Sequence, residues 1–253
     1  MKLVLVQPSL PTGVATMMTA IEACLRGLKL TAHDIVLLPE HTHQRASRQA
    51  YLDDICGLAA ELGANVVGGS HHQRESDAAV NTGAVVSPDG VVISEYDKLR
   101  PYAAERRVVE PGGRLGEMVV AGRRILVTIC ADFWFTDLFT RAEHLPDLVL
   151  VPAYSVTRKP TPDYSRSLWR HLAIARAYEL GVYVGISDWS HSPEAPKPTT
   201  SGVGGFADPT TTDPDGFFTP IAEGVLAVDL SFDALETFRA DRIARGFFWK
   251  KPR

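Results

Sequence analysis

The sequence predicts a single α/β domain whose core is a mixed, mostly parallel β-sheet. Short runs of Val, Ile and Leu recur along the chain, and segments with helical spacing separate several of them. Runs that are apolar at every position are typical of strands buried on both faces. Alternation of strands and helices favours right-handed crossovers between parallel strands, while two further segments predict antiparallel hairpins.

Six apolar runs are predicted to be the buried strands. In chain order they are Leu3–Val6, Ile35–Leu38, Val66–Val67, Ile125–Ile129, Leu148–Val151 and Val182–Ile186. Three stretches between them place apolar residues on one helical face: Met17, Met18, Ile21, Leu25 and Leu28, then Tyr51, Ile55, Leu58, Ala59 and Leu62, then Leu168, Leu172, Ala175 and Leu180. Gly63 and Gly181 follow the second and third stripes and predict the ends of those helices.

Two segments interrupt the alternation and predict hairpins, which make the sheet mixed. They are Ala84–Val86 with Val91–Ser94, across a Ser-Pro-Asp-Gly turn, and Met118–Val120 with Arg123–Ile129, across Ala-Gly. The sequence contains no internal repeat, linker or block of charge. We therefore expect residues 1–253 to form one domain.

The charge and the cysteine content of the chain indicate which binding partners and which cellular compartment to expect. The formal net charge is −4 and the pI is about 6.1, so we expect neither nucleic acid nor a membrane surface as a partner. The three cysteines, Cys24, Cys56 and Cys130, form no close pair, which is typical of a reducing compartment. The apolar start of the chain is too short for a signal peptide, and no run approaches a membrane span. These features predict a cytoplasmic protein.

Three chemically complementary residues follow apolar or extended segments. Glu40, Lys98 and Cys130 come after the predicted strands at 35–38, 91–94 and 125–129. Taken singly, each has an ordinary explanation as a cap, a solvated lysine or a buried thiol. Together they fit one site, because residues at the carboxyl ends of strands can converge from distant parts of the sequence.

The chemistry of these three residues is that of a cysteine hydrolase. A thiol attacks carbon as the thiolate, so Cys130 needs a neighbouring base, and the Glu40 carboxylate can serve. The Lys98 ammonium can stabilise the negative charge of a tetrahedral intermediate. If the chain turns sharply at Cys130, the backbone N–H of Ala131 can also donate to that oxyanion.

The segments around these residues resemble the nitrilase, or carbon–nitrogen hydrolase, superfamily, and in particular its short amidase-like members. The resemblance is carried by Leu37-Leu38-Pro39-Glu40, Tyr96-Asp97-Lys98-Leu99-Arg100-Pro101-Tyr102 and Ile129-Cys130-Ala131-Asp132-Phe133, followed in the family's order by Pro146–Ala153, Gly204–Pro209 and Gly224–Leu230. It implies a four-layer α-β-β-α sandwich and a homodimer formed through the helical layer. It also implies a Glu–Lys–Cys triad and a second, positioning glutamate, for which Glu105 is the best match and Glu110 the alternative.

One departure from the family pattern concerns the pocket. Trp134 stands where family members often carry arginine, which predicts an apolar wall and weakens the case for a carboxylate-bearing substrate. We expect Ala131, Trp134 and Tyr154 to contact the substrate, although Tyr154 could equally be structural. The chain is also shorter than typical nitrilases, which favours a dimer over a filament.

The resulting hypothesis is hydrolysis of a non-peptide C–N bond in a small amide through a Cys130 thioester. A nitrile or an N-carbamoyl amine is the alternative substrate, and Arg158 or Arg166 could bind the carboxylate of the latter. A non-catalytic scaffold of the same fold is the third alternative. We expect no cofactor and no metal, because neither His41 with His43 nor His71 with His72 has the spacing of a zinc site, and we interpret both pairs as loop histidines near a sheet edge.

Overall fold

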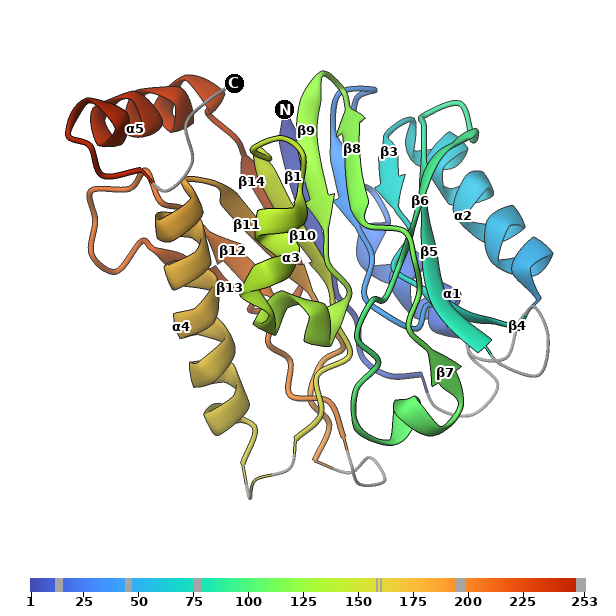
Figure 1. Cartoon of the computed structure of the whole chain (residues 1–253). Coiled ribbons are helices and arrows are strands. Elements are labelled where there is room, and N and C mark those ends of the chain that lie inside the picture. The colour runs from blue at the N-terminus through green and yellow to red at the C-terminus, as the bar shows by residue number, and fades with distance from the viewer. Residues whose placement is uncertain are drawn as a thin grey trace.

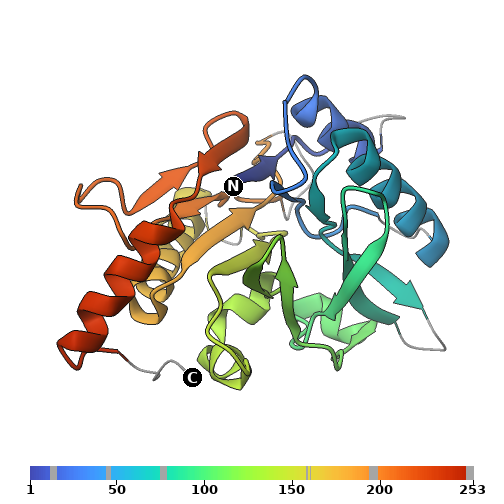
Figure 2. The same ribbon diagram turned by 90° about the horizontal axis from the view of Figure 1, so that it is seen from above.

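Two mixed β-sheets face each other, and helices cover the outer face of each one (Figure 1). The structure is a computed structural model that describes residues 1–11, 16–43, 47–74, 79–157, 159, 161–193 and 199–248. Figure 2 shows the layers from above, with α1 and α2 on one side of the sheets and α4 and α5 on the other. The predicted α-β-β-α sandwich is confirmed.

The first sheet has the order β14-β1-β2-β3-β5-β4, with β6 and β7 also paired to β5. Its strands are β1 (Lys2–Gln7), β2 (Ile35–Leu37), β3 (Asn65–Val67), β4 (His71–Arg74), β5 (Ala79–Val86), β6 (Val92–Asp97), β7 (Val109–Glu110) and β14 (Gly224–Asp229). The central pairs β1–β2 and β2–β3 are parallel. Its outer face is covered by α1 (Met17–Leu25) and α2 (Arg48–Leu62).

The second sheet has the order β13-β12-β11-β10-β9-β8. Its strands are β8 (Gly116–Val120), β9 (Arg123–Val127), β10 (Leu148–Pro152), β11 (Tyr183–Ser187), β12 (Gly205–Ala207) and β13 (Phe218–Pro220). The pairs β9–β10 and β10–β11 are parallel. The helices beside it are α3 (Thr136–Arg141), α4 (Asp163–Leu180) and α5 (Phe232–Ala244), with 3-10 turns at Ala103–Arg107 and Cys130–Trp134.

The continuous apolar run of β1 is explained by burial on both faces. Leu3 and Leu5 belong to the core between the sheets, whereas Val4 and Val6 belong to the core under α1 and α2. The sheets approach so closely at Gly185 that an added Cβ would lie 2.8 Å from Leu5 Cδ2. A side chain there would have to displace a packed core residue.

Hydrogen bonds also join the two sheets near their carboxyl ends. The hydroxyl of Ser187, the last residue of β11, donates to the Leu37 carbonyl at 2.8 Å and accepts from the Val6 N–H at 2.9 Å. Both sheets are therefore fixed relative to each other next to Glu40, which lies three residues beyond β2.

The six predicted strands, three helices and two hairpins are all present, with shifted ends. For example, α1 stops at Leu25, before Leu28, because the chain turns at Gly27, where φ is +81°. Helix α5 has no counterpart among the predicted elements. The interpretation of the histidines as loop residues is wrong for His71 and His72, which both belong to strand β4 at the sheet edge; His71 is fully buried. Among the described helices, none has the length and apolarity that a membrane span requires.

Candidate active site

Glu40 and Lys98 meet in the interior, as the sequence predicts. The Lys98 Nζ donates to Glu40 Oε1 at 2.7 Å, and the two residues are 2% and 1% exposed. The Glu40 backbone is held by its own N–H donating to the Ala153 carbonyl at 3.2 Å and by Trp189 Nε1 donating to the Glu40 carbonyl at 2.7 Å. These bonds fix Glu40 against the residues that follow β10 and β11.

Cys130 lies on a sharp turn at the end of the β9 segment. Its φ is +48°, in the left-handed region that non-glycine residues seldom adopt, and it begins the 3-10 turn Cys130–Trp134. The predicted sharp turn is thus present. The side chain is 8% exposed, with Sγ 3.8 Å from the Tyr154 carbonyl oxygen. A strained turn at a candidate nucleophile is a common feature of functional sites.

Glu105 is the second glutamate of the cluster. Its Oε2 accepts from Lys98 Nζ at 2.6 Å, whereas Glu110 lies on β7 as an exposed residue. The structure therefore brings Glu105, and not Glu110, to the lysine. Burial by itself would raise the pKa of Glu105, but the hydrogen bond from His72 and the charge of Lys98 together hold that pKa well below its usual value.

The ionisation of Lys98 follows from its two carboxylate neighbours. Burial opposes the charged form, but the negative charges of Glu40 and Glu105 outweigh it and raise the pKa of Lys98. The ammonium ion therefore persists at all ordinary pH values. Two of its three N–H groups donate to Glu40 and Glu105.

The thiol of Cys130 is neutral in the free protein. Burial raises the pKa of Cys130 well above its usual value, and the nearby Glu40 carboxylate raises it further, against the opposing effect of Lys98. A base must therefore remove the thiol proton before the sulfur can attack carbon.

Asn81 joins the two glutamates and is absent from the sequence-based candidates. Its Nδ2 donates to Glu40 Oε1 at 2.9 Å and to Glu105 Oε1 at 2.8 Å, and the residue is fully buried on β5. Its backbone carbonyl also accepts from the Lys98 N–H at 2.8 Å. The sequence signal that could have revealed it is the polar pair Asn81-Thr82 within a strand that is otherwise made of Ala, Val and Gly.

A second set of polar residues supports the loop that faces Cys130. The buried carboxylate of Asp188, just after β11, accepts hydrogen bonds from the Ser155 N–H at 3.0 Å and from the Val203 N–H at 2.9 Å. Burial raises the pKa of Asp188 above its usual value. Because Ser155 follows Tyr154, this carboxylate holds the carbonyl that contacts Cys130 Sγ.

A cavity of about 430 Å³ opens beside Cys130. It is lined by all three predicted substrate-contacting residues, Ala131, Trp134 and Tyr154, and by further aromatic side chains including Phe135 and Trp169. Lys159 lies at its edge, with Nζ 5.2 Å from the centre of the Tyr164 ring. The lining of this cavity is therefore mainly apolar.

Arg166, one of the two arginines proposed for a carboxylate, does not line this cavity. Arg166 borders a different, larger cavity of about 590 Å³ together with Arg170, His171 and His191. Its Nε donates to the Ser201 carbonyl at 2.8 Å. Arg158 lies outside the described residues. We place the chemistry in the smaller cavity, because Cys130 lines that cavity.

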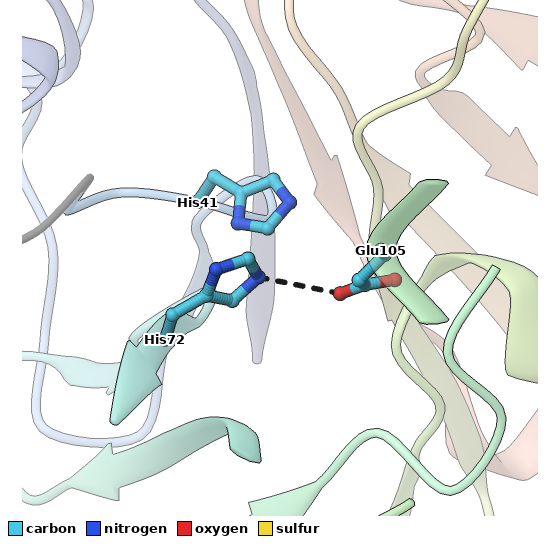
Figure 3. Close-up of side chains that lie close together, drawn as sticks. All are labelled: His41, His72 and Glu105. Carbon is cyan, nitrogen blue, oxygen red and sulfur yellow. Dashed lines mark hydrogen bonds and ion pairs between the residues drawn. The ribbon is translucent and has the colours of Figure 1, made fainter. Parts of the chain in front are cut away.

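Two histidines complete the surroundings of the glutamates. His41, in the turn directly after Glu40, has its Nε2 3.8 Å from Glu40 Oε1, and its ring meets the ring of Tyr154 edge-on at 5.3 Å. His72, on β4, has its Nε2 3.3 Å from Glu105 Oε1 (Figure 3). The two imidazole rings lie edge to face, with centroids 4.7 Å apart.

Comparison with known proteins decides the family. The sequence model of the carbon–nitrogen hydrolase family matches residues 2–189, about three quarters of the chain. The chain belongs to the carbon–nitrogen hydrolase family. This hydrolase-family chain is 25% identical to human omega-amidase NIT2 over 157 residues, which are 53% of the chain and 55% of that protein. It is 26% identical to the "hydrolase in agr operon" of Staphylococcus lugdunensis over 166 residues, 60% of the chain and 69% of that protein.

Solved structures confirm the fold of this carbon–nitrogen hydrolase over nearly its whole length. A CN-hydrolase superfamily protein of Xanthomonas campestris superposes with a TM-score of 0.77 at 23% identity, covering 100% of this chain and 98% of the other. Nit3 of Saccharomyces cerevisiae, a nitrilase-superfamily member, gives 0.73 at 20% identity, with 95% and 93% covered. The amidase of Nesterenkonia sp. AN1 gives 0.70 at 20% identity, with 98% and 100% covered.

Proposed function

We propose that this chain hydrolyses the C–N bond of a small amide, with Cys130 as nucleophile, Glu40 as general base and acid, and Lys98 as the oxyanion donor. The observation that carries the proposal is the buried 2.7 Å bond between Lys98 Nζ and Glu40 Oε1 next to a neutral thiol. A buried ion pair is costly to maintain. A charged pair beside a strained cysteine fits catalysis better than it fits a purely structural role.

The reaction begins when Glu40 takes the proton of the Cys130 thiol and the sulfur attacks the amide carbon. The oxygen becomes an oxyanion, to which we assign the third N–H of Lys98 and the backbone N–H of Ala131. The C–N bond then breaks, and the leaving nitrogen takes the proton from Glu40, which leaves a thioester on the sulfur.

The second half of the reaction consumes water. Glu40 removes a proton from water, the hydroxide oxygen attacks the thioester carbon, and the S–C bond breaks. The proton returns to the sulfur, and the carboxylic acid departs. Glu105 holds Lys98 in place throughout, through its 2.6 Å hydrogen bond. No step requires a metal or an organic cofactor.

The cavity favours an apolar substrate over a carboxylate-bearing one. Trp134 and the other aromatic walls suit an alkyl or aryl group, and Arg166 belongs to the other cavity. These features favour an amide over the alternative N-carbamoyl amine that carries a free carboxylate. A nitrile of similar shape remains the second candidate, since it needs the same nucleophile.

The named relatives support the reaction class. Human NIT2 is an omega-amidase, and in a mutant of the Nesterenkonia amidase acrylamide has added to the active-site cysteine. The alternative of a non-catalytic scaffold gains no support from a buried site in which Lys98 bonds Glu40 and the charges of both act on the Cys130 thiol.

We also propose the number of domains, the oligomeric state and the cellular location of the protein. The whole chain is taken as one domain that pairs into a homodimer through its helical layer, where Tyr164, Leu168 and Tyr178 of α4 expose large apolar surfaces. Three free cysteines are compatible with a reducing, cytoplasmic location. Light scattering coupled to gel filtration measures the oligomeric state, and a monomeric mass would refute the dimer.

The decisive experiment is a substrate panel combined with capture of the acyl adduct. Ammonia release is measured for acetamide, hexanamide, phenylacetamide, phenylacetonitrile and an N-carbamoyl amino acid, and intact-mass spectrometry follows rapid acid quenching. We expect the amides to release ammonia and to leave an acyl group on Cys130. A Cys130→Ala variant that retained turnover, or an adduct that persisted in it, would refute the assignment.

A further inference from the structure

Three side chains that can bind a metal lie close together next to the ion pair of Lys98 with Glu105. One donor atom each from His41, His72 and Glu105 lies within 4.8 Å of the other two. Figure 3 shows His72 directed at Glu105, with the ring of His41 beside it. The three residues come from different elements: the turn after β2, strand β4 and the 3-10 turn Ala103–Arg107. The two histidines belong to different sequence pairs, so spacing within either pair gives no sign of the cluster.

The geometry is close to that of a tetrahedral site. Ligands about 2.0–2.2 Å from zinc in a tetrahedron lie roughly 3.4 Å apart. The 3.3 Å separation of His72 Nε2 and Glu105 Oε1 already meets this value, and when a metal binds there the proton of this hydrogen bond leaves for solvent or moves to Nδ1 of His72. His41 supplies the third donor atom, which lies within 4.8 Å of the other two, so its ring has to move closer to them to complete three ligands, with the fourth position left to water.

The local charge favours a cation. Glu40 and Glu105 bring two negative charges, and Lys98, 2.7 and 2.6 Å from them, brings one positive charge. One negative charge therefore remains on this group of three. A neutral imidazole such as that of His41 offers a ring-nitrogen lone pair to a metal.

We propose that His41, His72 and Glu105 form a binding site for a divalent transition-metal ion such as Zn²⁺, with two imidazole nitrogens and one carboxylate oxygen as ligands. This set is a recognised zinc combination of two histidines and one glutamate. Glu105 Oε1 becomes the metal ligand, while Oε2 keeps its hydrogen bond to Lys98.

Bound metal inhibits the hydrolase, a consequence that rests on the proposed function. The ion competes with Asn81 for Glu105 Oε1, to which Asn81 Nδ2 donates at 2.8 Å. The charge of the ion also lies near Glu40, whose Oε1 is 3.8 Å from His41 Nε2. A dication there competes with the Lys98 ammonium for the carboxylates of Glu40 and Glu105, which hold that ammonium in place.

Metal binding is measured on tag-free protein, so that it does not depend on turnover. Titration calorimetry with Zn²⁺ and the visible absorption of bound Co²⁺ are recorded for the wild type and for Cys130→Ala. We expect both proteins to bind one ion with similar affinity, and the Co²⁺ spectrum to lack thiolate charge transfer. Loss of binding in Cys130→Ala would overturn the proposal, because the ligand would then be the sulfur.

The ligand assignment is tested with His41→Gln, His72→Gln and the control His33→Gln, whose histidine is exposed between α1 and β2. We expect each of the first two to weaken Zn²⁺ binding at least about tenfold and the control to leave it unchanged. Circular dichroism checks folding, and Glu105→Gln replaces any variant that is unfolded. Equal affinity in all folded variants would overturn the site.

The inhibition is tested separately, on whichever amide the panel identifies. We expect Zn²⁺ to inhibit the wild type reversibly, with full recovery on adding a chelator, and to inhibit His41→Gln at least about tenfold less strongly. If no amide is turned over, the binding measurements on Cys130→Ala still decide the metal site. Equal zinc sensitivity of His41→Gln and wild type would refute the link to inhibition.

Discussion

The carboxylate of Asp132 accepts a hydrogen bond from the backbone N–H of Leu99 at 3.0 Å, which ties the turn at Cys130 to the loop after Lys98. A second bond, from the Arg100 N–H at 2.8 Å, completes the link. Asp132 is almost fully buried. One carboxylate thus sets the relative position of the candidate nucleophile and the candidate oxyanion donor, although it touches neither reacting atom.

Removing this link is expected to reduce turnover without removing a reacting group. In Asp132→Ala, two backbone donors lose their partner, at a cost of about 1–3 kcal/mol in unfolding free energy. We expect kcat to fall about 10- to 100-fold with little change in KM, because positioning errors act mainly on the chemical step. Steady-state kinetics and urea unfolding measure both effects. The control is Asp137→Ala, an exposed aspartate of the same stretch, and identical kinetics for the two variants would contradict the prediction.

Asp132 also predicts a pH dependence of stability. Burial raises the pKa of Asp132 to about 6 from 3.8, although the hydrogen bonds from the Leu99 and Arg100 N–H groups act to lower it. Because the folded protein holds this proton more tightly than the unfolded chain, its contribution to stability is lost as pH rises from about 4 to 6, by about 3 kcal/mol. The difference in unfolding free energy between wild type and Asp132→Asn should change by that order between pH 4 and 7. A constant difference over this range would contradict it.

The reactivity of Cys130 should follow the protonation of its thiol. Because burial and Glu40 raise its pKa, we expect the rate of alkylation by iodoacetamide to rise about tenfold per pH unit between pH 6 and 8. In Glu40→Gln the thiol loses the neighbouring negative charge, so alkylation should be faster while amide turnover falls. Peptide mass mapping separates Cys130 from Cys24 and Cys56. A rate independent of pH would indicate a preformed thiolate and contradict this prediction.

A third carboxylate beside Glu40 and Glu105 should be poorly tolerated. In Asn81→Asp, the new group lies about as close to both glutamates as the amide did, and it can no longer donate a hydrogen bond once ionised. Like charges raise its pKa, so we expect stability relative to wild type to fall as pH rises above about 5. Urea unfolding at pH 5 and pH 8 measures this. Asn81→Ser is the uncharged control and should show no comparable pH effect.

Trp134 should select substrates by the size of their apolar group. Truncation in Trp134→Ala removes a wall of the cavity and is expected to lower kcat/KM for phenylacetamide about 10- to 100-fold, with a much smaller effect on acetamide. The ratio of the two values is the measurement. The exposed Val119→Ala on β8 is the control and should leave that ratio unchanged. An equal loss for both amides would show that Trp134 supports the fold more than the substrate.

Local patterns in the sequence predicted six buried strands, two hairpins, three helices and the three central residues, but not helix α5. Apolar runs such as Leu3–Val6 predicted strands buried on both faces, and the structure has two cores on opposite faces of β1. Glu40, Lys98 and Cys130 were predictable because each follows a recognisable strand, and strand ends converge in an α/β sandwich.

The polar groups that surround these three residues follow from the packing of the fold. The β4–β5 register pairs His72 with Asn81, and this pairing brings both residues to Glu105. Likewise, the ring of His41, in the turn after β2, contacts the ring of His72 on β4. Arg166 lines a different cavity from the one that Cys130 lines. The spacing of apolar residues along the sequence indicates which face of a strand is buried. Strand register and sheet packing determine which side chains become neighbours. These neighbours are many residues apart in the chain, so no local pattern encodes them.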